Sequence, residues 1–280
     1  MSDDISSILG DWPYRPDEIT VRVVDGEDGR RKIQLRLDLG ILQMDFDGRP
    51  DGRRIHGCTS WFEFHQRRQK EHDQANPDSA PYVLEPEDCQ ELLREGVQYY
   101  HRYLSFWHLG LYELCARDTE RNLRLFAFVR DHAREERIRL EFDQWRPYVT
   151  MMHARAVATP LVELEQWEAA VNVLDAGIRG IEQFLADYNQ KEKASNVGEL
   201  AFLQRWKQEI LEKNRPPALE APAESATEST VPAPPDPIKQ VRKDLSRAIK
   251  EERYEDAARL RDDLRKLKDQ PPPPLPGPLG

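Results

Sequence analysis

The sequence predicts a mainly α-helical protein: an N-terminal β-hairpin, an αα-hairpin body, a disordered proline-rich linker and a C-terminal antiparallel helical hairpin. Three observations support this fold class. Apolar residues alternate with polar ones over residues 18–46, they recur every three or four residues over most of 86–213, and prolines gather in 214–237 and 270–280. Strict alternation is typical of a half-buried strand, whereas the longer spacing is typical of an amphipathic helix.

Residues 1–16 are polar and proline-interrupted, and we expect them to form an N-terminal arm. We expect residues 17–58 to form a β-hairpin followed by a loop rich in glycine and arginine. The strands ITVRVV and KIQLRLDLGI flank the turn sequence DGEDGR, and the alternation changes phase at Gly40, where we expect a β-bulge. A two-stranded ribbon is marginally stable alone, so it has to lie on the helical body or on a partner.

Residues 59–213 are expected to form the helical body. Ser60 precedes Glu63 by three residues, which is the spacing of a capping box, and Pro86 suits the first turn of a helix. We expect the charged run REERIRLE to be a connection between helices. Further helices are expected to begin at Asp118, Pro147, Trp167 and Asn196.

A weak internal similarity links LYELCARDTERN, which starts at Leu111, to LVELEQWEAAVN, which starts fifty residues later at Leu161. Together with the successive helix pairs, it predicts stacked αα-hairpins. The body is similar in architecture alone to tetratricopeptide-type arrays, because its small and aromatic residues do not follow the consensus of that family.

The two proline-rich segments differ in composition. Residues 214–237 hold seven prolines among Ala, Ser, Thr and Glu, and they are expected to be a disordered, extended linker. Residues 270–280 hold six prolines and no charge, which favours polyproline II. Such a tail suits an aromatic groove of the SH3 kind, although a solvated tail is the simpler interpretation.

Between the two proline-rich segments, residues 238–269 carry two apolar stripes at helical spacing, separated by the short turn sequence KEER. This pattern predicts an antiparallel helical hairpin in which an alanine doublet lets two backbones approach closely. The predicted interaction residues of the two stripes are Val241, Leu245, Ala248, Tyr254, Ala257, Ala258, Leu260, Leu264 and Leu267.

This segment resembles the UvrB/UvrC motif, also called the UVR domain. The resemblance lies in the apolar spacing, the small residue before the turn, the Tyr254–Glu255 pair, the alanine doublet and the sequence LRD. It implies a helical hairpin that pairs with another such hairpin or docks on a partner protein. The motif joins two proteins in nucleotide-excision repair, and it also occurs in Clp-type chaperone ATPases and in a regulator of arginine kinase activity.

Charge and cysteine content limit the function classes. A net charge of −10 and a pI near 5.3 argue against direct binding of nucleic acid. Three scattered cysteines, no signal-peptide pattern and no membrane-length apolar run predict a cytoplasmic protein without membrane association. Residues 238–269 hold eleven Lys or Arg and eight Asp or Glu. This surplus of +3 suits an acidic partner, and a solvated helix face is the simpler interpretation.

Two groups of residues are candidate ligand sites. The loop DFDGRPDGRR, with Arg49, Arg53 and Arg54, is a speculative ligand loop, but it lacks the pattern of a P-loop, and arginines paired with body carboxylates are the favoured interpretation. His56, Cys58 and His65 have metal-binding side chains, but their spacing matches no known zinc pattern, so we expect structural roles and no metal or cofactor.

A third candidate is the aromatic run from Tyr99 to Tyr112, which includes His101 and His108. It resembles a cofactor pocket in composition, yet its helical spacing favours the core of a hairpin stack.

The sequence therefore predicts a non-enzymatic adaptor that uses the hairpin to bind another protein or a second copy of itself. The first alternative is an accessory factor of nucleotide-excision repair that acts through a repair-protein partner. The second is a regulator of Clp-type protein quality control. The third is a metal- or ligand-binding enzyme centred on residues 45–65.

Overall fold

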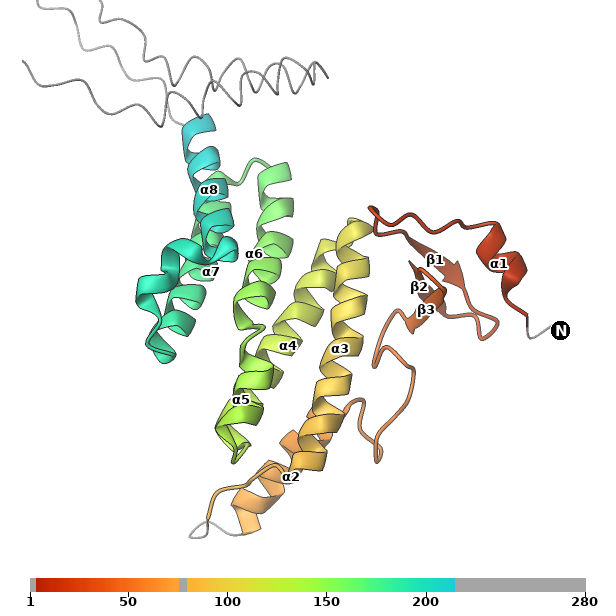
Figure 1. Cartoon of the computed structure of the whole chain (residues 1–280), viewed down its shortest axis with the longest axis horizontal. Helices are drawn as coiled ribbons and strands as arrows, with labels where there is room; N and C mark the ends of the chain where they lie inside the picture. The colour runs from red at the N-terminus through yellow and green to blue at the C-terminus, as the bar shows by residue number, and fades with distance from the viewer. Residues whose placement is uncertain (1–3, 76–79, 215–280) are drawn as a thin grey trace, which may run out of the picture. The chain divides into compact units, whose positions relative to one another are not determined.

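The computed structural model describes residues 4–75 and 80–214, and it confirms a mainly helical fold with an N-terminal antiparallel sheet (Figure 1). The predicted linker, hairpin 238–269 and tail 270–280 lie outside the described residues, apart from Asn214. The elements in chain order are α1 (Ser6–Gly10), β1 (Val21–Asp25), β2 (Arg31–Leu37), β3 (Gly40–Asp45), α2 (Trp61–Ala75), α3 (Pro86–His108), α4 (Tyr112–His132), α5 (Glu136–Asp143), α6 (Arg146–Glu163), α7 (Trp167–Asp187), the 3₁₀ helix η1 (Lys191–Asn196) and α8 (Gly198–Lys213).

The N-terminal sheet has three antiparallel strands in the order β1-β2-β3, so the expected two-stranded ribbon was incomplete. Leu37 pairs with Gly40, and Asp38 and Leu39 form the tight turn between β2 and β3. The predicted bulge at Gly40 is therefore wrong. The apolar alternation changes phase there because the chain reverses direction.

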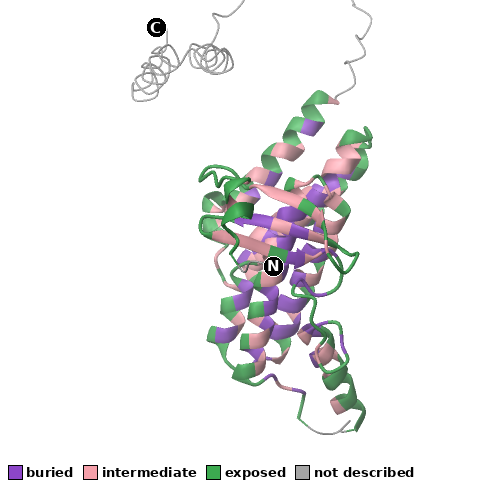
Figure 2. Ribbon diagram, turned by 90° about the vertical axis from the view of Figure 1, so that its right-hand side faces the viewer, coloured by how far each residue is buried: buried purple, intermediate pink, exposed green. Residues whose placement is uncertain are grey.

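One face of the sheet lies on the helical body. Ile33 and Leu35 of β2 and Met44 of β3 are buried, and they join the core of helices α3–α6. Figure 2 shows buried segments running through the strands and through the helices behind them. The alternating pattern thus located the buried face of β2 correctly, and the sheet is stabilised by the body.

The long helices form a sequential array. Helix α4 packs between α3 and α6, and α7 packs between α6 and α8. The α3–α4 and α6–α7 connections have the same geometry. Gly110 and Glu165 both have positive φ, and the next N–H in each case donates to the carbonyl five residues back. These C-terminal caps satisfy carbonyls at the helix ends.

Three details of the helical prediction are wrong. The equivalent turns at Gly110 and Glu165 are 55 residues apart. The two similar segments that start at Leu111 and Leu161 are 50 residues apart, so they do not occupy equivalent positions in the two helix pairs. Asp118 does not begin a helix, because it lies within α4 and is buried. The run REERIRLE is not a loop, because most of it belongs to α5.

Helix α6 joins the two parts of the core. Val149 and Met152 belong to the cluster that includes the sheet, whereas Ala154 and Ala158 belong to the cluster shared with α7 and α8. A Cβ atom placed on Gly177 of α7 would lie 2.9 Å from the Cβ of Ala154. The α6–α7 crossing is therefore close because small residues face each other there.

Candidate functional site

The loop after β3 is held by a mostly buried group of charged residues, in which Arg117 alone is 39% exposed. We call this group the clamp: Arg49, Glu95, Arg102, Arg117, Asp118 and Arg121. At its centre Arg102 of α3 and Asp118 of α4 are each 1% exposed. Arg102 donates from Nε and Nη2 to both carboxylate oxygens of Asp118, at 2.6 and 3.0 Å. Its Nη1 also donates to the carbonyls of Asp45 and Gly48, at 3.1 and 2.8 Å. This bidentate pair fixes both the loop and the crossing of α3 and α4.

The second centre of the clamp is Glu95, which is fully buried. Its carboxylate accepts the N–H groups of Trp61 and Phe62 at 2.7 and 3.1 Å, and it pairs with Arg121 and Arg49. Glu95 thus caps the first turn of α2 from a distant helix and neutralises two guanidinium groups.

Ser60 completes this end of α2. Its Oγ accepts the N–H of Glu63 at 3.0 Å, as the predicted capping box requires. The carboxylate of Glu63 binds the N–H of Thr59 rather than that of Ser60. The expected capping box therefore forms in part, because the Glu63 carboxylate accepts from the residue before the predicted cap residue.

The three loop arginines have different roles in this arrangement. Arg49 is buried and pairs with Glu95, which agrees with the favoured interpretation that loop arginines pair with body carboxylates, and its role in a ligand loop stays a prediction. Arg53 and Arg54 are exposed, and the guanidinium of Arg54 donates to the carbonyl of Gly57 at 2.9 Å. A ligand role for Arg53 and Arg54 stays a prediction.

The metal candidates of the sequence do not converge. His56 is exposed, Cys58 is buried, and His65 is fully buried with its Nδ1 2.9 Å from the Tyr82 hydroxyl. Among the described residues, no three His, Cys, Asp or Glu side chains lie together as metal ligands would. Burial lowers the pKa of His65, which favours a neutral ring bound to Tyr82.

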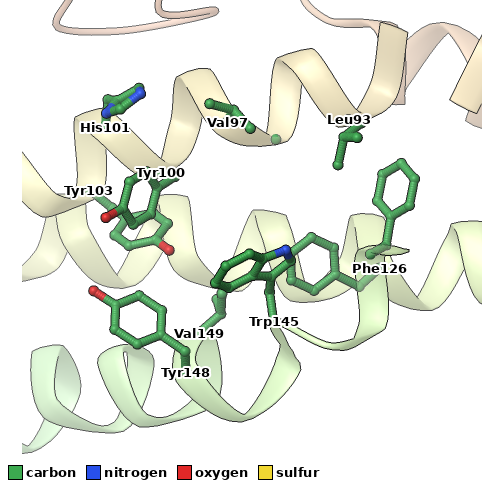
Figure 3. A pocket seen from close by; sticks show the side chains of 11 residues that line it. Leu93, Val97, Tyr100, His101, Tyr103, Phe126, Trp145, Tyr148 and Val149 are labelled. Atoms are coloured by element: carbon green, nitrogen blue, oxygen red, sulfur yellow. The ribbon is translucent and has the colours of Figure 1, made fainter. Parts of the chain in front are cut away.

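A groove lies on the other side of α3 and has a volume of about 410 Å³. Leu93, Val97, Tyr100 and Tyr103 of α3 form one wall, Trp145, Tyr148 and Val149 form the other, and Phe126 of α4 lies between. Figure 3 shows the three tyrosines together at one end, Leu93 and Phe126 at the other, and Trp145 between them. We call this feature the groove.

The groove contains hydroxyl groups that have no hydrogen-bond partner in the part of the chain that the structure describes. Within the described ranges, the hydroxyls of Tyr100, Tyr103 and Tyr148 form no hydrogen bond, although their rings pack together with centroids 5.5 and 6.3 Å apart. Tyr103 is 1% exposed. Burial raises the pKa of Tyr103 and Tyr148, so both hydroxyls stay protonated and available as donors.

The groove was only partly foreseen from the sequence. The run Tyr99–Tyr112 contributes Tyr103 and Phe106 to the core, as its helical spacing predicts. Tyr100 and His101 also line the groove, and Tyr99 lies on the clamp side. Trp145 was missed, because an exposed tryptophan between two helices gives no periodic signal. Its exposed fraction of 55% identifies it only once the structure is known.

Other features restrict the chemistry of the described body. Burial raises the pKa of Cys89 and of Cys115 to about 12, so neither thiol ionises readily. None of the helices in the described ranges combines the length and apolar character that crossing a bilayer requires.

Comparison with known families decides the nature of the C-terminal segment. The family model described as "UvrB/uvrC motif" matches residues 236–270. The chain carries a UVR motif. The matched range contains all nine predicted interaction residues, from Val241 to Leu267, and it confirms the resemblance found in the sequence. No curated protein and no solved structure matches the chain.

Proposed function

We propose that this protein is a non-enzymatic adaptor whose UVR motif binds another protein or a second copy of the chain. The match of residues 236–270 to the UvrB/uvrC motif carries the proposal, because UVR motifs generally mediate protein–protein interaction. The predicted hairpin is thin, so each of its two apolar stripes stays half exposed until a second surface covers it.

Charge supports association with an acidic surface. Residues 238–269 carry a surplus of +3, and the chain as a whole carries −10, so the rest of the chain carries −13. Opposite charges accelerate encounter and orient partners more than they add affinity. The acidic body of a second copy is one surface that meets this requirement.

The non-enzymatic part of the proposal is supported by the described body. The buried charges of the clamp pair with one another rather than facing a cavity. The groove has uncharged walls apart from His101, and two of the three cysteines carry thiols of high pKa. These features favour a structural and binding role for the body over acid–base or nucleophilic catalysis.

The test is affinity purification of the full-length chain from its native cells beside a chain lacking residues 238–269. The proposal predicts that the deletion removes the retained partners and leaves the melting transition of the body unchanged. Retention of the same partners by both chains would refute it. Repair proteins among the partners would favour the repair alternative, and Clp-type ATPases or proteases would favour protein quality control.

A further inference from the structure

The groove has the dimensions and lining of a small-molecule site. Its volume of about 410 Å³ falls within the range of ligand pockets, and its walls are almost entirely aromatic and aliphatic. Val97 and Trp145 are 47% and 55% exposed, so the groove opens to the surface at these two side chains. An apolar molecule entering there would remove exposed aromatic and aliphatic surface from water.

The unpaired tyrosine hydroxyls favour a ligand that carries a hydrogen-bond acceptor in addition to its apolar surface. Tyr103 is 1% exposed as a whole residue, and its hydroxyl has no hydrogen-bond partner among the described residues, so this donor is available to a molecule in the groove. Tyr100 and Tyr148 bring two further hydroxyls to the same end of the groove (Figure 3). A bound molecule with an acceptor oxygen at that end would accept a hydrogen bond from a hydroxyl that has no partner in the described body.

We propose that the groove binds an uncharged, mostly apolar small molecule with a flat ring system and a carbonyl oxygen. The ring lies against Trp145 and reaches toward Leu93 and Phe126, and the carbonyl accepts a hydrogen bond at the tyrosine end. This inference does not rest on the adaptor function, because it uses only the described body.

The absence of charged walls decides the class of ligand. No Lys, Arg, Asp or Glu lines the groove. The guanidinium of Arg155 interacts electrostatically with Tyr148. Arg155 is already held over the rings of Trp107 and Phe202, with centroid distances of 4.2 and 5.0 Å. A carboxylate or ammonium group in the groove would therefore lose hydration without gaining an ionic partner.

The probe for the first test is 6-propionyl-2-dimethylaminonaphthalene, an uncharged naphthalene with one carbonyl whose emission depends on hydrogen bonding. The full-length protein should bind it saturably, with one site per chain. Val97→Trp places an indole at the opening of the groove and should weaken binding at least tenfold. Val23→Trp on β1 is the matched control, because Val23 is 40% exposed and lies outside the groove, and it should bind as the wild type does.

A second measurement tests the hydrogen bond itself. Tyr103→Phe should weaken binding several-fold and shift the emission of the bound probe to shorter wavelength, because the carbonyl loses its donor. Tyr99→Phe is the control, since the Tyr99 hydroxyl donates to the carbonyl of Gly48 on the clamp side. That variant should leave the emission unchanged. A merely structural role of Tyr103 would not move the emission.

Several results would overturn the proposal. Equal binding by Val97→Trp and Val23→Trp would show that the probe binds elsewhere. Tighter binding of 8-anilinonaphthalene-1-sulfonate than of the uncharged N-phenyl-1-naphthylamine would contradict the uncharged class. Unchanged emission of the bound probe with Tyr103→Phe would show that the probe carbonyl does not accept a hydrogen bond at the tyrosine end. Displacement of the probe by the synthetic peptide QPPPPLPGPLG would show that the groove is a site for proline-rich peptides instead.

Discussion

Helix α3 has two faces that differ in whether their polar side chains find hydrogen-bond or ion-pair partners. On the clamp face, Glu95 and Arg102 are buried charges, and each one finds several partners from the β3 loop, from α2 or from α4. On the groove face, Tyr100 and Tyr103 carry hydroxyls that find none among the described residues. The polar groups of the clamp face are paired with other residues of the fold. The tyrosine hydroxyls of the groove face are available to donate a hydrogen bond to a ligand.

This difference separates a structural role from a binding role. A buried network of charges that pair with one another rigidifies a fold, because removing any member leaves a buried charge without compensation. An unsatisfied donor in an apolar cavity lowers stability slightly and gains a partner when a ligand arrives. The comparison therefore predicts that clamp variants change folding and that groove variants change binding.

The largest expected effect comes from breaking the clamp. Arg102→Met leaves the carboxylate of Asp118 with Arg117 as its ion-pair partner among the described residues and releases the carbonyls of Asp45 and Gly48, so we expect a loss of about 3–5 kcal/mol in the free energy of unfolding. The control is Arg94→Met on the same helix. Its side chain is 66% exposed, and it should change stability by less than about 0.5 kcal/mol. Urea unfolding of both variants measures the difference, and equal losses would contradict the account.

A pair of glycine substitutions sharpens the comparison between tight and open regions of the body. A Cβ on Gly177 would lie 2.9 Å from Ala154, whereas a Cβ on Gly96, beside the groove, would lie 3.4 Å from its nearest neighbour, the side chain of Leu125. Gly177→Ala should lose about 1–3 kcal/mol through overpacking. Gly96→Ala should gain up to about 1 kcal/mol from helix propensity. Thermal melts of the two variants should therefore shift in opposite directions.

The groove hydroxyl provides a smaller stability test. Tyr103→Phe removes a hydroxyl that has no hydrogen-bond partner within residues 4–75 and 80–214, so the free energy of unfolding should stay within about 1 kcal/mol of the wild type or rise. Tyr99→Phe removes a donor to the carbonyl of Gly48 and should lose about 1 kcal/mol. A larger loss with Tyr103→Phe than with Tyr99→Phe would contradict the distinction between the two faces.

The smallest effect is a pH dependence on the groove side. Burial lowers the pKa of His101, so below the unfolded-state pKa near 6.5 the unfolded chain binds protons more readily than the folded chain. This contribution to stability is present above that pH and is lost as the pH falls. His153 shifts in the same direction, also through burial. The free energy of unfolding of His101→Gln should therefore fall less than that of the wild type between pH 7.5 and 5.5. Urea denaturation at several pH values measures this difference. An identical dependence of the free energy of unfolding on pH in both proteins would exclude a contribution from His101.

The parts of the fold that depend on local pattern were predictable from the sequence. Helix starts at Pro86 and Trp167 and the buried face of β2 follow from spacing alone. The turn at Gly40 was misinterpreted, because a chain reversal and a bulge change the phase of an alternating pattern in the same way. The UVR motif was recognisable because its hallmarks lie within one short segment.

The groove and the clamp were not predictable, because their residues come from distant parts of the sequence. Arg49 meets Glu95 of α3, and Tyr100 of α3 meets Tyr148 of α6. No periodicity within a single helix indicates which of its polar residues will find a partner on another element. The choice between paired and unpaired groups is made by tertiary packing, which a single sequence does not report.

The central claim is that the UVR motif, and not the body, carries association with a partner. The most direct measurement compares the partner retained by two full-length variants on an affinity resin. Ala257→Asp with Ala258→Asp places two charges in the predicted crossing of the hairpin, and Ala221→Asp with Ala223→Asp adds the same charges to the proline-rich linker. The account predicts at least a tenfold loss of partner for the first variant and wild-type retention for the second. Equal retention by both would contradict it.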